Sequence, residues 1–402
     1  MTNEEKNKKI QELLIRGVEN IYPSSDFLKS KLENISDGER LTIYLGIDPT
    51  GPSIHLGNAI ALKKLGEFQK LGCRVVLLIG DFTAMIGDPT DKKATRKQLT
   101  HEEVLNNCKL YKKQASALLD FKGENPAELK FNSKWFGKMK FEDVLNLASK
   151  MTVSQMLERD MFQVRLKEGK PIFLHEFMYP LMQGYDSVEM NVDGEVGGND
   201  QTFNMLVGRN LLKEIKNKEK FVLTMKLLTD QSGVKMGKTE GNMVALSDEP
   251  GMMFGKIMSW EDSMIFSGFE LCTNVPIEEM NDLKKEMAEG KNPRDIKLRL
   301  AYEIVRIYYG DKKAKKAEKD FIKTFQKKEI PEDMEEVNGK VGELLSDTLL
   351  LKGVVNSKSE FGRLVGEGAV SIDGIKISDN WARIDRLPIV VKIGKKKFVK
   401  IV

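Results

Sequence analysis

The sequence predicts an α/β protein of more than one domain, and three observations lead to this fold class. Apolar runs alternate with helical patterns from residue 41 to about 228, as in a parallel sheet whose strands are joined by helices. Residues 248 to about 328 then show helical periods with few strand signals, and the remainder mixes short helices with short strands. The length of 402 residues is typical of two or three domains.

The first elements are the clearest. Residues 1 to about 40 predict helix, and Leu41–Ile47 predicts the first inner strand. A turn rich in Pro and Gly follows, then a helix that ends at Gly72, and then a second strand, Val75–Ile79. Strand, helix and strand in this order build a Rossmann-like parallel sheet. Lys220–Leu223 predicts a further inner strand.

The pattern changes near Leu227, where a Gly-rich stretch, Thr229–Asn242, leads into the helical region. Ile330-Pro-Glu-Asp333 interrupts the helical pattern as a linker does. The last module predicts helices at Val341–Leu351 and Ser359–Glu367 and strands at Ala369–Ile372, Val390–Ile393 and Lys397–Ile401. The predicted parts are a sheet domain with an N-terminal helix, a mobile loop, a helical domain, a linker and a small α+β domain: residues 1–228, 229–247, 248–330, 331–340 and 341–402.

Composition narrows the class of protein. We expect no signal peptide and no membrane span, because no apolar stretch follows the Lys- and Glu-rich N-terminus. Three scattered cysteines favour buried thiols in a reducing cytosol over a disulfide frame or a zinc site, and only three histidines are present, so we predict no metal site. Residues 341–402 carry 11 Lys and Arg against 7 acids. This excess fits a polyanionic partner and, equally, a solvated Lys-rich surface.

The turn His55-Leu-Gly57-Asn58 opens the first predicted helix. Free N–H groups and the positive end of the helix dipole point there toward the carboxyl edge of the sheet, where nucleotide phosphates bind. Glycine at position 57 lets a ligand approach the backbone, while the imidazole and the amide are potential donors to phosphate. The four letters alone are a weak motif, and their position after a strand is what favours a nucleotide site.

A second segment, Lys235-Met-Gly237-Lys238-Thr239, combines two ammonium groups and a hydroxyl with glycines that disfavour a stable helix. A mobile basic loop of this kind is suited to closing over a triphosphate. Taken alone, it is equally typical of a solvated loop, and it gains weight only together with the earlier turn.

Three polar residues, Tyr179, Gln183 and Asp186, share one face of a mostly apolar predicted helix. Buried polar groups need partners, which are either a ligand or internal hydrogen bonds. Two polar loops complete the set: Gly87-Asp88-Pro-Thr-Asp-Lys92-Lys with Arg96, and Gly197-Gly-Asn-Asp200-Gln201. Each loop alone is typical of an ordinary surface loop.

With these pieces in this order, the chain resembles the tyrosyl-tRNA synthetases, in the bacterial form that ends in an S4-type RNA-binding domain. The resemblance covers nearly the whole chain. His55-Leu-Gly-Asn58 is similar to the class I HIGH signature, and Lys235-Met-Gly-Lys-Thr239 is similar to KMSKS. The lead-in Tyr44-Leu-Gly-Ile-Asp48-Pro-Thr50, the Tyr179 helix and the tail from Ser357 to Gly374 match the tyrosine enzyme and the S4 motif.

Two departures stand out. Asn58 replaces the second histidine of the family signature, and Gly237 with Thr239 replace two serines. An amide keeps a donor in place of imidazole and threonine keeps a hydroxyl, so these changes indicate a subfamily variant.

The resemblance implies that the tyrosine carboxylate attacks the α-phosphate of ATP, and that tRNA(Tyr) then accepts the tyrosyl group. The first step needs in-line positioning and positive charge. The residues implied for it are Thr50, His55, Lys92, Arg96, Lys235, Lys238 and Thr239. ATP binding is implied for Gly57, Asn58, Asp200, Gln201 and Lys238, and Mg²⁺ is expected with the pyrophosphate.

The resemblance also implies a tyrosine pocket and an RNA surface. Tyr44 and Asp186 would bond the substrate phenol, while Asp88, Tyr179 and Gln183 would hold the ammonium group. The full tyrosine-binding set is Tyr44, Asp48, Asp88, Tyr179, Gln183 and Asp186, and the RNA-binding set is Lys358, Arg363 and Lys376. The helices of residues 248–328 would contact the anticodon stem and the S4-like tail the long variable arm. A cytoplasmic homodimer without membrane contact is expected.

Three other functions remain open at this point. A tryptophanyl-tRNA synthetase shares both signatures, although Asp186 with Tyr44 favours a phenol, and no S4 tail is expected there. A non-catalytic RNA-binding protein on the same fold is disfavoured by the basic residues that both loops retain. Other nucleotidyltransferases with a similar signature lack the helical and S4 modules.

Overall fold

The structure is a computed structural model, and it describes residues 2–35, 39–88, 99–233, 235–236, 243–325, 334–394 and 397–402. Contacts within the chain divide it into two compact units, residues 1–314 and 315–402. The finer domain boundaries expected from the sequence remain predictions. Among the described residues, no helix has the length and hydropathy of a membrane span.

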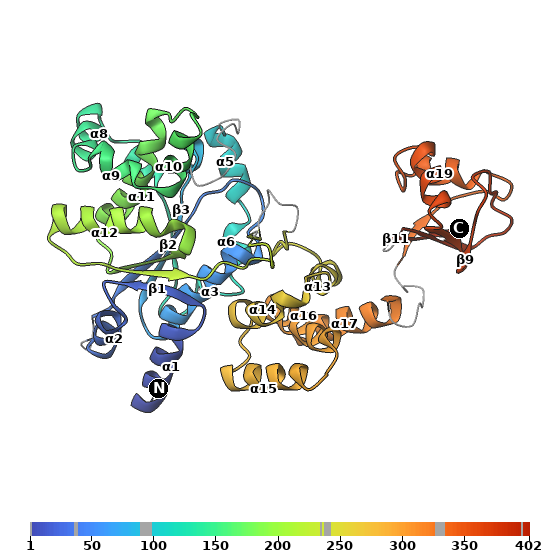
Figure 1. Ribbon diagram of the computed structural model, residues 1–402, viewed down its shortest axis with the longest axis horizontal. Helices are drawn as coiled ribbons and strands as arrows, with labels where there is room; N and C mark the ends of the chain where they lie inside the picture. Colours follow the sequence, from blue (N-terminus) through green and yellow to red (C-terminus); the bar gives the residue numbers. More distant parts are fainter. Residues whose placement is uncertain are drawn as a thin grey trace. The chain divides into compact units, whose positions relative to one another are not determined.

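The first unit is built on a six-stranded sheet with the strand order β1-β6-β5-β2-β3-β4 (Figure 1). Every neighbouring pair is parallel except β1 and β6, which are antiparallel. The strands are β1 (Val18–Tyr22), β2 (Thr42–Ile47), β3 (Arg74–Ile79), β4 (Glu128–Phe131), β5 (Gly194–Gly198) and β6 (Phe221–Met225).

Helices cover both faces of this sheet. Helix α3 (Leu56–Lys70) joins β2 to β3, and α12 (Thr202–Lys216) joins β5 to β6. The two crossovers run toward opposite edges of the sheet, so right-handed connections place α3 and α12 on opposite faces, as Figure 1 shows. The remaining helices of this part are α1 (Asn3–Ile15), α2 (Ser25–Glu33), α4 (Thr83–Ile86), α5 (His101–Cys108), α6 (Tyr111–Ala115), α7 (Ser133–Phe136), α8 (Phe141–Ala148), α9 (Val153–Leu157), α10 (Asp160–Lys167), α11 (Leu174–Met190) and η1 (Asn199–Gln201).

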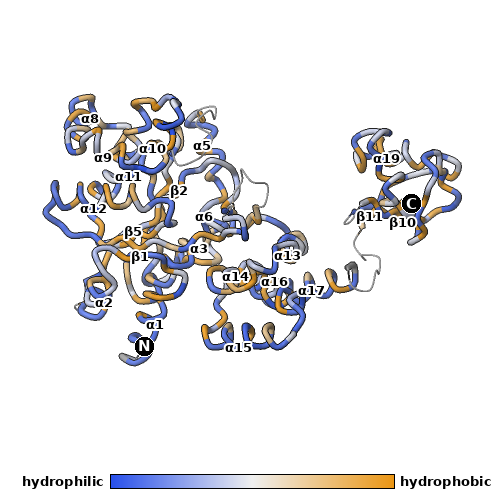
Figure 2. Tube along the Cα trace, in the orientation of Figure 1, coloured by the Kyte–Doolittle hydropathy of each residue, from blue (hydrophilic) through white to orange (hydrophobic). Residues whose placement is uncertain are grey.

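A helical region follows the sheet, as the sequence predicts. Helix α15 alternates apolar and polar residues from turn to turn (Figure 2), which is typical of a helix packed on one face. The helices are α13 (Pro250–Met258), η3 (Asp262–Met264), α14 (Ile265–Cys272), α15 (Ile277–Ala288), α16 (Pro293–Tyr309) and α17 (Asp311–Phe325). The division between the two units falls within α17.

The second unit folds around its own core beneath a five-stranded sheet with the order β7-β11-β10-β8-β9. Its elements are β7 (Glu335–Val337), α18 (Leu345–Leu351), α19 (Lys358–Gly366), β8 (Val370–Ile372), β9 (Ile375–Lys376), β10 (Ile389–Ile393) and β11 (Lys397–Ile401). The predicted fold class is therefore confirmed: a parallel-strand sheet, a helical region and a small α+β module.

The expectation for the first 40 residues was wrong in one respect. They contain a strand, β1, between α1 and α2. This edge strand pairs antiparallel with β6 from Val18 opposite Met225 to Tyr22 opposite Val222. None of its five residues is fully buried, and its sequence, Val-Glu-Asn-Ile-Tyr, lacks the continuous apolar run of the inner strands.

Candidate active site

The strand order creates a topological switch point between β2 and β5. From these neighbours the chain crosses to β3 on one side and to β6 on the other. Ligands of open α/β sheets bind in the crevice outside the carboxyl ends of the strands at such a point. Asp48 follows β2 and Asn199–Gln201 follows β5, so the predicted site residues on these segments lie at this crevice.

The turn before α3 is a capping box. His55 is the N-cap residue, and its Nδ1 accepts from the Asn58 backbone N–H at 3.3 Å, while the Asn58 side-chain oxygen accepts from the His55 N–H at 3.4 Å. Asn58 thus completes the capping box at the start of α3 and helps to hold the His55 imidazole in place. A Cβ at Gly57 would lie 3.0 Å from the His55 ring and 3.4 Å from the Met236 carbonyl oxygen, which accounts for the glycine.

Both described flanks of the predicted basic loop lie against this turn. On one side Met236 approaches Gly57, and on the other the Leu56 N–H donates to the Val244 carbonyl at 2.9 Å. The Leu246 N–H likewise donates to the Ile54 carbonyl at 2.8 Å. The two motifs, about 180 residues apart in the sequence, are therefore brought together at one place. Gly237, Lys238 and Thr239 themselves lie outside the described residues.

Lys235 is placed beside the strand-end segment after β5. Its Nζ lies 2.7 Å from an oxygen of Asp200, so these two predicted site residues are paired. Thr50 is exposed in the turn after β2, and its N–H donates to the Asp48 carbonyl at 2.8 Å. Lys92 and Arg96 lie outside the described residues.

Helix α11 presents its three predicted polar residues toward the sheet. The Tyr179 hydroxyl donates to Asp48 at 2.8 Å, and the other Asp48 oxygen accepts from the Thr83 hydroxyl at 2.7 Å. Burial raises the pKa of Tyr179 well above its ordinary value, and the negative charges of Asp48 and Asp88 add to this. Tyr179 is therefore a neutral donor.

Asp186 is buried at the inner end of the same face. It accepts from Trp135 Nε1 at 2.9 Å and from the Asn132 amide at 3.4 Å. Burial raises the pKa of Asp186 well above its usual range, and these two donors oppose that shift because they favour the carboxylate. Tyr44 is fully buried nearby, and its hydroxyl lies 3.0 Å from Ser187 Oγ.

A chain of hydrogen bonds links the predicted ammonium-binding and ATP-binding residues. Asp88 accepts from Gln201 Nε2 at 2.8 Å, and Gln201 in turn accepts from the Asn204 amide at 3.1 Å. The same amide donates to Gln183 Oε1 at 2.8 Å. Arg159 adds a buried cation, with a nitrogen 3.5 Å from Asp88.

Sequence reasoning missed several polar residues of this site. Asn132 and Trp135 follow β4, so a prediction of that strand would have placed them at the sheet edge. The others are single polar residues that belong to no motif in the sequence: Thr83, Arg159, Ser187, Glu195, Asn204 and Lys220.

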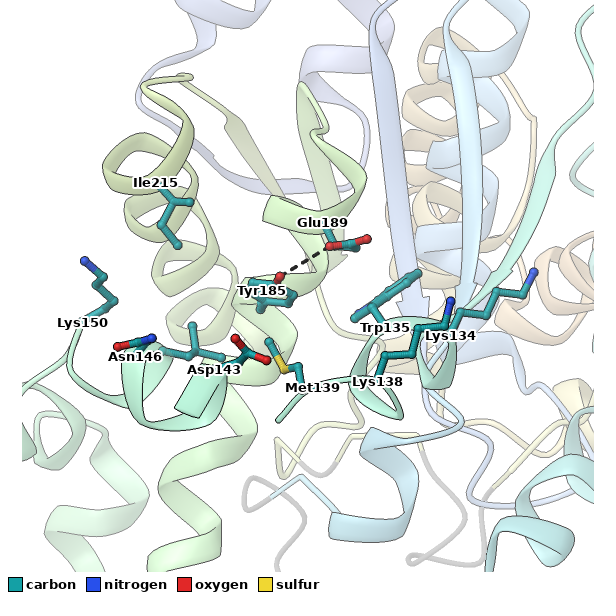
Figure 3. A pocket seen from close by; sticks show the side chains of 11 residues that line it. Lys134, Trp135, Lys138, Met139, Asp143, Asn146, Lys150, Tyr185, Glu189 and Ile215 are labelled. Atoms are coloured by element: carbon teal, nitrogen blue, oxygen red, sulfur yellow. Dashed lines mark hydrogen bonds between the residues drawn. The ribbon is translucent and has the colours of Figure 1, made fainter. Parts of the chain in front are cut away.

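A separate cavity of about 590 Å³ lies beside α7, α8 and α11 (Figure 3). It shares Trp135 with the site, because the ring lines the cavity while Nε1 donates to Asp186. The Tyr185 hydroxyl donates to Glu189 at 3.4 Å across its wall. None of the predicted tyrosine-binding or ATP-binding residues lines this cavity.

The predicted RNA-binding residues lie on the second unit. Lys358 begins α19 and pairs with Asp347 at 2.5 Å, and Arg363 of the same helix pairs with Glu367 at 2.7 Å. Lys376 is exposed on β9, and its Nζ would lie 3.5 Å from a Cβ at Gly368, just past the end of α19. All three side chains therefore remain near α19 and carry their charge at the surface.

Comparisons with known proteins agree with this geometry. Residues 36–326 match the family described as tRNA synthetases class I (W and Y). The chain is 46% identical over 408 residues to a tyrosine–tRNA ligase of Carboxydothermus hydrogenoformans, covering 98% of each chain. It is 45% identical to a tyrosine–tRNA ligase of Thermotoga maritima, covering 100% of this chain and 98% of the relative.

Solved structures share the fold. A C-terminally truncated mitochondrial tyrosyl-tRNA synthetase of Coccidioides posadasii is 24% identical, with a TM-score of 0.64 over 79% of this chain and 95% of its own. A tyrosyl-tRNA synthetase of Archaeoglobus fulgidus complexed with L-tyrosine is 21% identical, with a TM-score of 0.59 over 78% and 98%. The resemblance to tyrosyl-tRNA synthetases expected from the motifs is thus confirmed, and the chain belongs to the class I tRNA synthetases (W and Y).

Proposed function

We propose that this chain joins L-tyrosine to tRNA(Tyr), using ATP and releasing AMP and pyrophosphate. The observation that carries the proposal is the meeting of the α3 start with the flanks of the basic loop. Lys235 of this loop pairs with Asp200, and the next residue, Gln201, is linked to the polar face of α11 through Asn204. The curated relatives that match almost the whole chain are tyrosine–tRNA ligases, which supports the same activity.

In the first step a tyrosine carboxylate oxygen forms a bond to the α-phosphorus of ATP, and the bond to the leaving pyrophosphate breaks. The products are tyrosyl-adenylate and pyrophosphate. No protein nucleophile is needed, so the protein contributes in-line positioning and positive charge. We assign this task to the residues around the α3 start and the two basic segments: Thr50, His55, Lys92, Arg96, Lys235, Lys238 and Thr239.

The adenosine part of ATP and of the adenylate binds along the same edge. We assign Gly57, Asn58, Asp200, Gln201 and Lys238 to it. Gly57 supports this assignment because it has no side chain that would keep a ligand from the backbone at the α3 start. Asp200 and Gln201 support it by their position directly after β5.

The tyrosine pocket lies between β2 and α11 in this proposal. Asp186 accepts from the substrate phenol and Tyr44 donates to it, while Asp88, Tyr179 and Gln183 hold the ammonium group and Asp48 orients Tyr179. An indole presents an N–H but no oxygen to accept from Tyr44, so a tryptophan substrate would lose the hydrogen bond that Tyr44 donates to the phenol. The pocket thus favours tyrosine over tryptophan.

In the second step a terminal ribose hydroxyl of the tRNA attacks the carbonyl carbon of the adenylate, and AMP leaves. We propose that helices α13 to α17 meet the anticodon stem and that the second unit binds the variable arm through Lys358, Arg363 and Lys376. The surface charge of these residues supports phosphate contacts, which depend on salt.

We propose that Mg²⁺ enters with ATP. Among the described residues, no group of three or more His, Cys, Asp or Glu residues is placed to hold a metal ion. In proteins, Mg²⁺ commonly binds substrate phosphates while it keeps several waters. When bound, the ion would supply positive charge to the departing pyrophosphate.

We also propose a cytoplasmic homodimer. Large apolar side chains are exposed from α8 to the start of α11, with Phe141 77% and Leu174 83% exposed, and we propose that they form a patch that associates with a second copy. Further exposed members are Leu145, Val153, Val164, Leu166 and Phe173. Sedimentation of the wild type and of Leu174→Asp tests the patch: a dimer that persists in the variant would place the interface elsewhere.

Amino-acid-dependent pyrophosphate exchange with each of the twenty amino acids tests the function. We expect exchange with tyrosine alone, followed by charging of tRNA(Tyr). Exchange with tryptophan would establish the alternative substrate, and no exchange with any amino acid would overturn catalysis by this chain.

A further inference from the structure

A buried ion pair lies behind the proposed tyrosine pocket and has no part in the chemistry above. Lys220, directly before β6, and Glu195, in β5, have side chains that are 0% and 3% exposed, and Lys220 Nζ contacts a Glu195 oxygen. A buried ion pair is a poor source of stability, because desolvating both charges offsets their attraction. The side chains that it contacts, Ser187 and Gln183, indicate a role in directing hydrogen bonds.

Lys220 determines where the hydroxyl of Ser187 points. Its ammonium group has donors only, so Ser187 Oγ accepts from it, at 2.6 Å. The Ser187 proton can then go to the Tyr44 oxygen at 3.0 Å or to Glu195 at 3.5 Å, and the shorter contact is Tyr44. Tyr44 therefore accepts from Ser187, and its own proton is the one it can donate to a substrate oxygen, in place of its present acceptors, the Gln183 carbonyl at 3.5 Å and Glu195.

Glu195 determines which way the amide of Gln183 points. An ionised carboxylate only accepts, so Gln183 turns its Nε2 toward Glu195, at 3.2 Å. Its Oε1 then faces away and accepts from Asn204 at 2.8 Å, with one lone pair left for a further donor. An ammonium group only donates hydrogen bonds, so it needs the amide oxygen of Gln183, and not the amide nitrogen, as its partner.

We propose that the Lys220–Glu195 pair is a positioning device that sets hydrogen-bond direction at both ends of the tyrosine pocket. Through Ser187 it makes Tyr44 a donor to the phenol oxygen, and through Gln183 it presents an amide oxygen to the ammonium group. The inference rests on the proposed function and deepens it.

Two variants separate the two ends. Ser187→Ala removes the link to Tyr44 alone, whereas the double variant Glu195→Gln with Lys220→Met removes both charges together and leaves no unpaired buried ion. Phenylalanine carries the ammonium group but no hydroxyl, so it reports only on the Gln183 end. Pyrophosphate exchange gives kcat/KM for tyrosine and phenylalanine and the KM for ATP.

For Ser187→Ala we expect kcat/KM for tyrosine to fall about tenfold, the effect of one hydrogen bond, with no change for phenylalanine. For the double variant we expect both amino acids to lose about tenfold or more, with the KM for ATP unchanged. Lys64→Met is the matched control, because Lys64 is a lysine 1% exposed that bonds the Leu13 carbonyl away from the pocket. It should lower the melting temperature and leave all three kinetic values unchanged.

The inference fails if Ser187→Ala lowers kcat/KM for both amino acids equally, or if the double variant changes only the melting temperature as the control does. If the double variant does not fold, Ser187→Ala alone decides. A wild-type chain without tyrosine-dependent exchange would overturn the proposed function itself, which distinguishes the two failures.

Discussion

Tyr179 donates its hydroxyl to the carboxylate of Asp48 at 2.8 Å, and so ties the buried face of α11 to the carboxyl end of the central strand β2. The two residues are separated by 131 positions in the sequence. Because the acceptor is a carboxylate with a second donor in Thr83, this bond fixes Asp48 between the helix and the strand-end loop.

Tyr179→Phe removes this hydrogen bond to a partly buried carboxylate. We expect a loss of about 2 kcal/mol in the free energy of unfolding, the range for hydrogen bonds to charged groups. The KM for tyrosine should rise about tenfold, because the ammonium-binding end loses a fixed hydroxyl. Urea denaturation and pyrophosphate exchange measure the two effects, and a stability loss with an unchanged KM would restrict Tyr179 to a structural role.

Asp186→Ala should abolish selectivity for the phenol. The carboxylate is the proposed acceptor of the substrate hydroxyl, so kcat/KM for tyrosine should fall by about 100-fold while that for phenylalanine changes little. Competition between the two amino acids in pyrophosphate exchange measures the ratio. Tyrosine activation close to the wild-type value would remove Asp186 from the pocket.

Trp135→Phe should alter the pH dependence through Asp186. Loss of the Nε1 donor removes one of the two hydrogen bonds that favour the carboxylate, so the pKa of Asp186 should rise further above its usual range. A carboxyl whose folded-state pKa is raised stabilises the fold while protonated, and this stability is lost as pH rises through the folded-state pKa.

The variant should therefore lose more stability at high pH than at low pH, and the acidic limb of its kcat/KM profile for tyrosine should move to higher pH. Trp381→Phe, at a tryptophan 71% exposed in the second unit, is the matched control and should leave both profiles unchanged. An unshifted acidic limb in Trp135→Phe would mean that Asp186 does not titrate in the reaction.

The central strands and the α11 face were predictable because their signals are local. Thr42–Ile47 and Arg74–Ile79 are apolar runs joined by a helix, and Tyr179, Gln183 and Asp186 repeat at helical spacing. The fold class followed from these patterns and was confirmed.

Other elements carried no local signal. β5 reads Gly-Glu-Val-Gly-Gly and β4 has only four half-buried residues, so neither shows an apolar run, although both pair with inner strands. Lys220 resembles a surface lysine in the sequence, and its buried role depends on Glu195, a partner 25 positions away in the neighbouring strand. Partners across strands are set by tertiary structure and cannot be read from one segment.

Deletion of residues 341–402 should spare adenylate formation and sharply weaken tRNA charging. Apart from Val337, the buried core cluster of the second unit is drawn from residues inside this range, so its removal leaves the sheet of the first unit intact. Pyrophosphate exchange should stay within about twofold of wild type, while charging should lose the salt-dependent part of tRNA affinity. Equal losses in both assays would instead mean that the tail supports the catalytic fold.

Gly57→Ala tests the convergence of the two phosphate-binding segments. The new Cβ would lie 3.0 Å from two atoms of the His55 ring and 3.4 Å from the Met236 carbonyl, so the imidazole or the loop flank must shift. A small displacement of groups that position reacting atoms is costly in rate, and we expect kcat for exchange to fall about 100-fold. The KM for tyrosine should change little, because its pocket lies on the α11 side.

Gly72→Ala is the control at the other end of α3, where nothing lies within 4 Å of a Cβ. Its positive φ of 89° should lower stability and leave kcat unchanged. Full kcat in Gly57→Ala would show that the crowding of His55 and Met236 around this glycine has no part in the adenylation step.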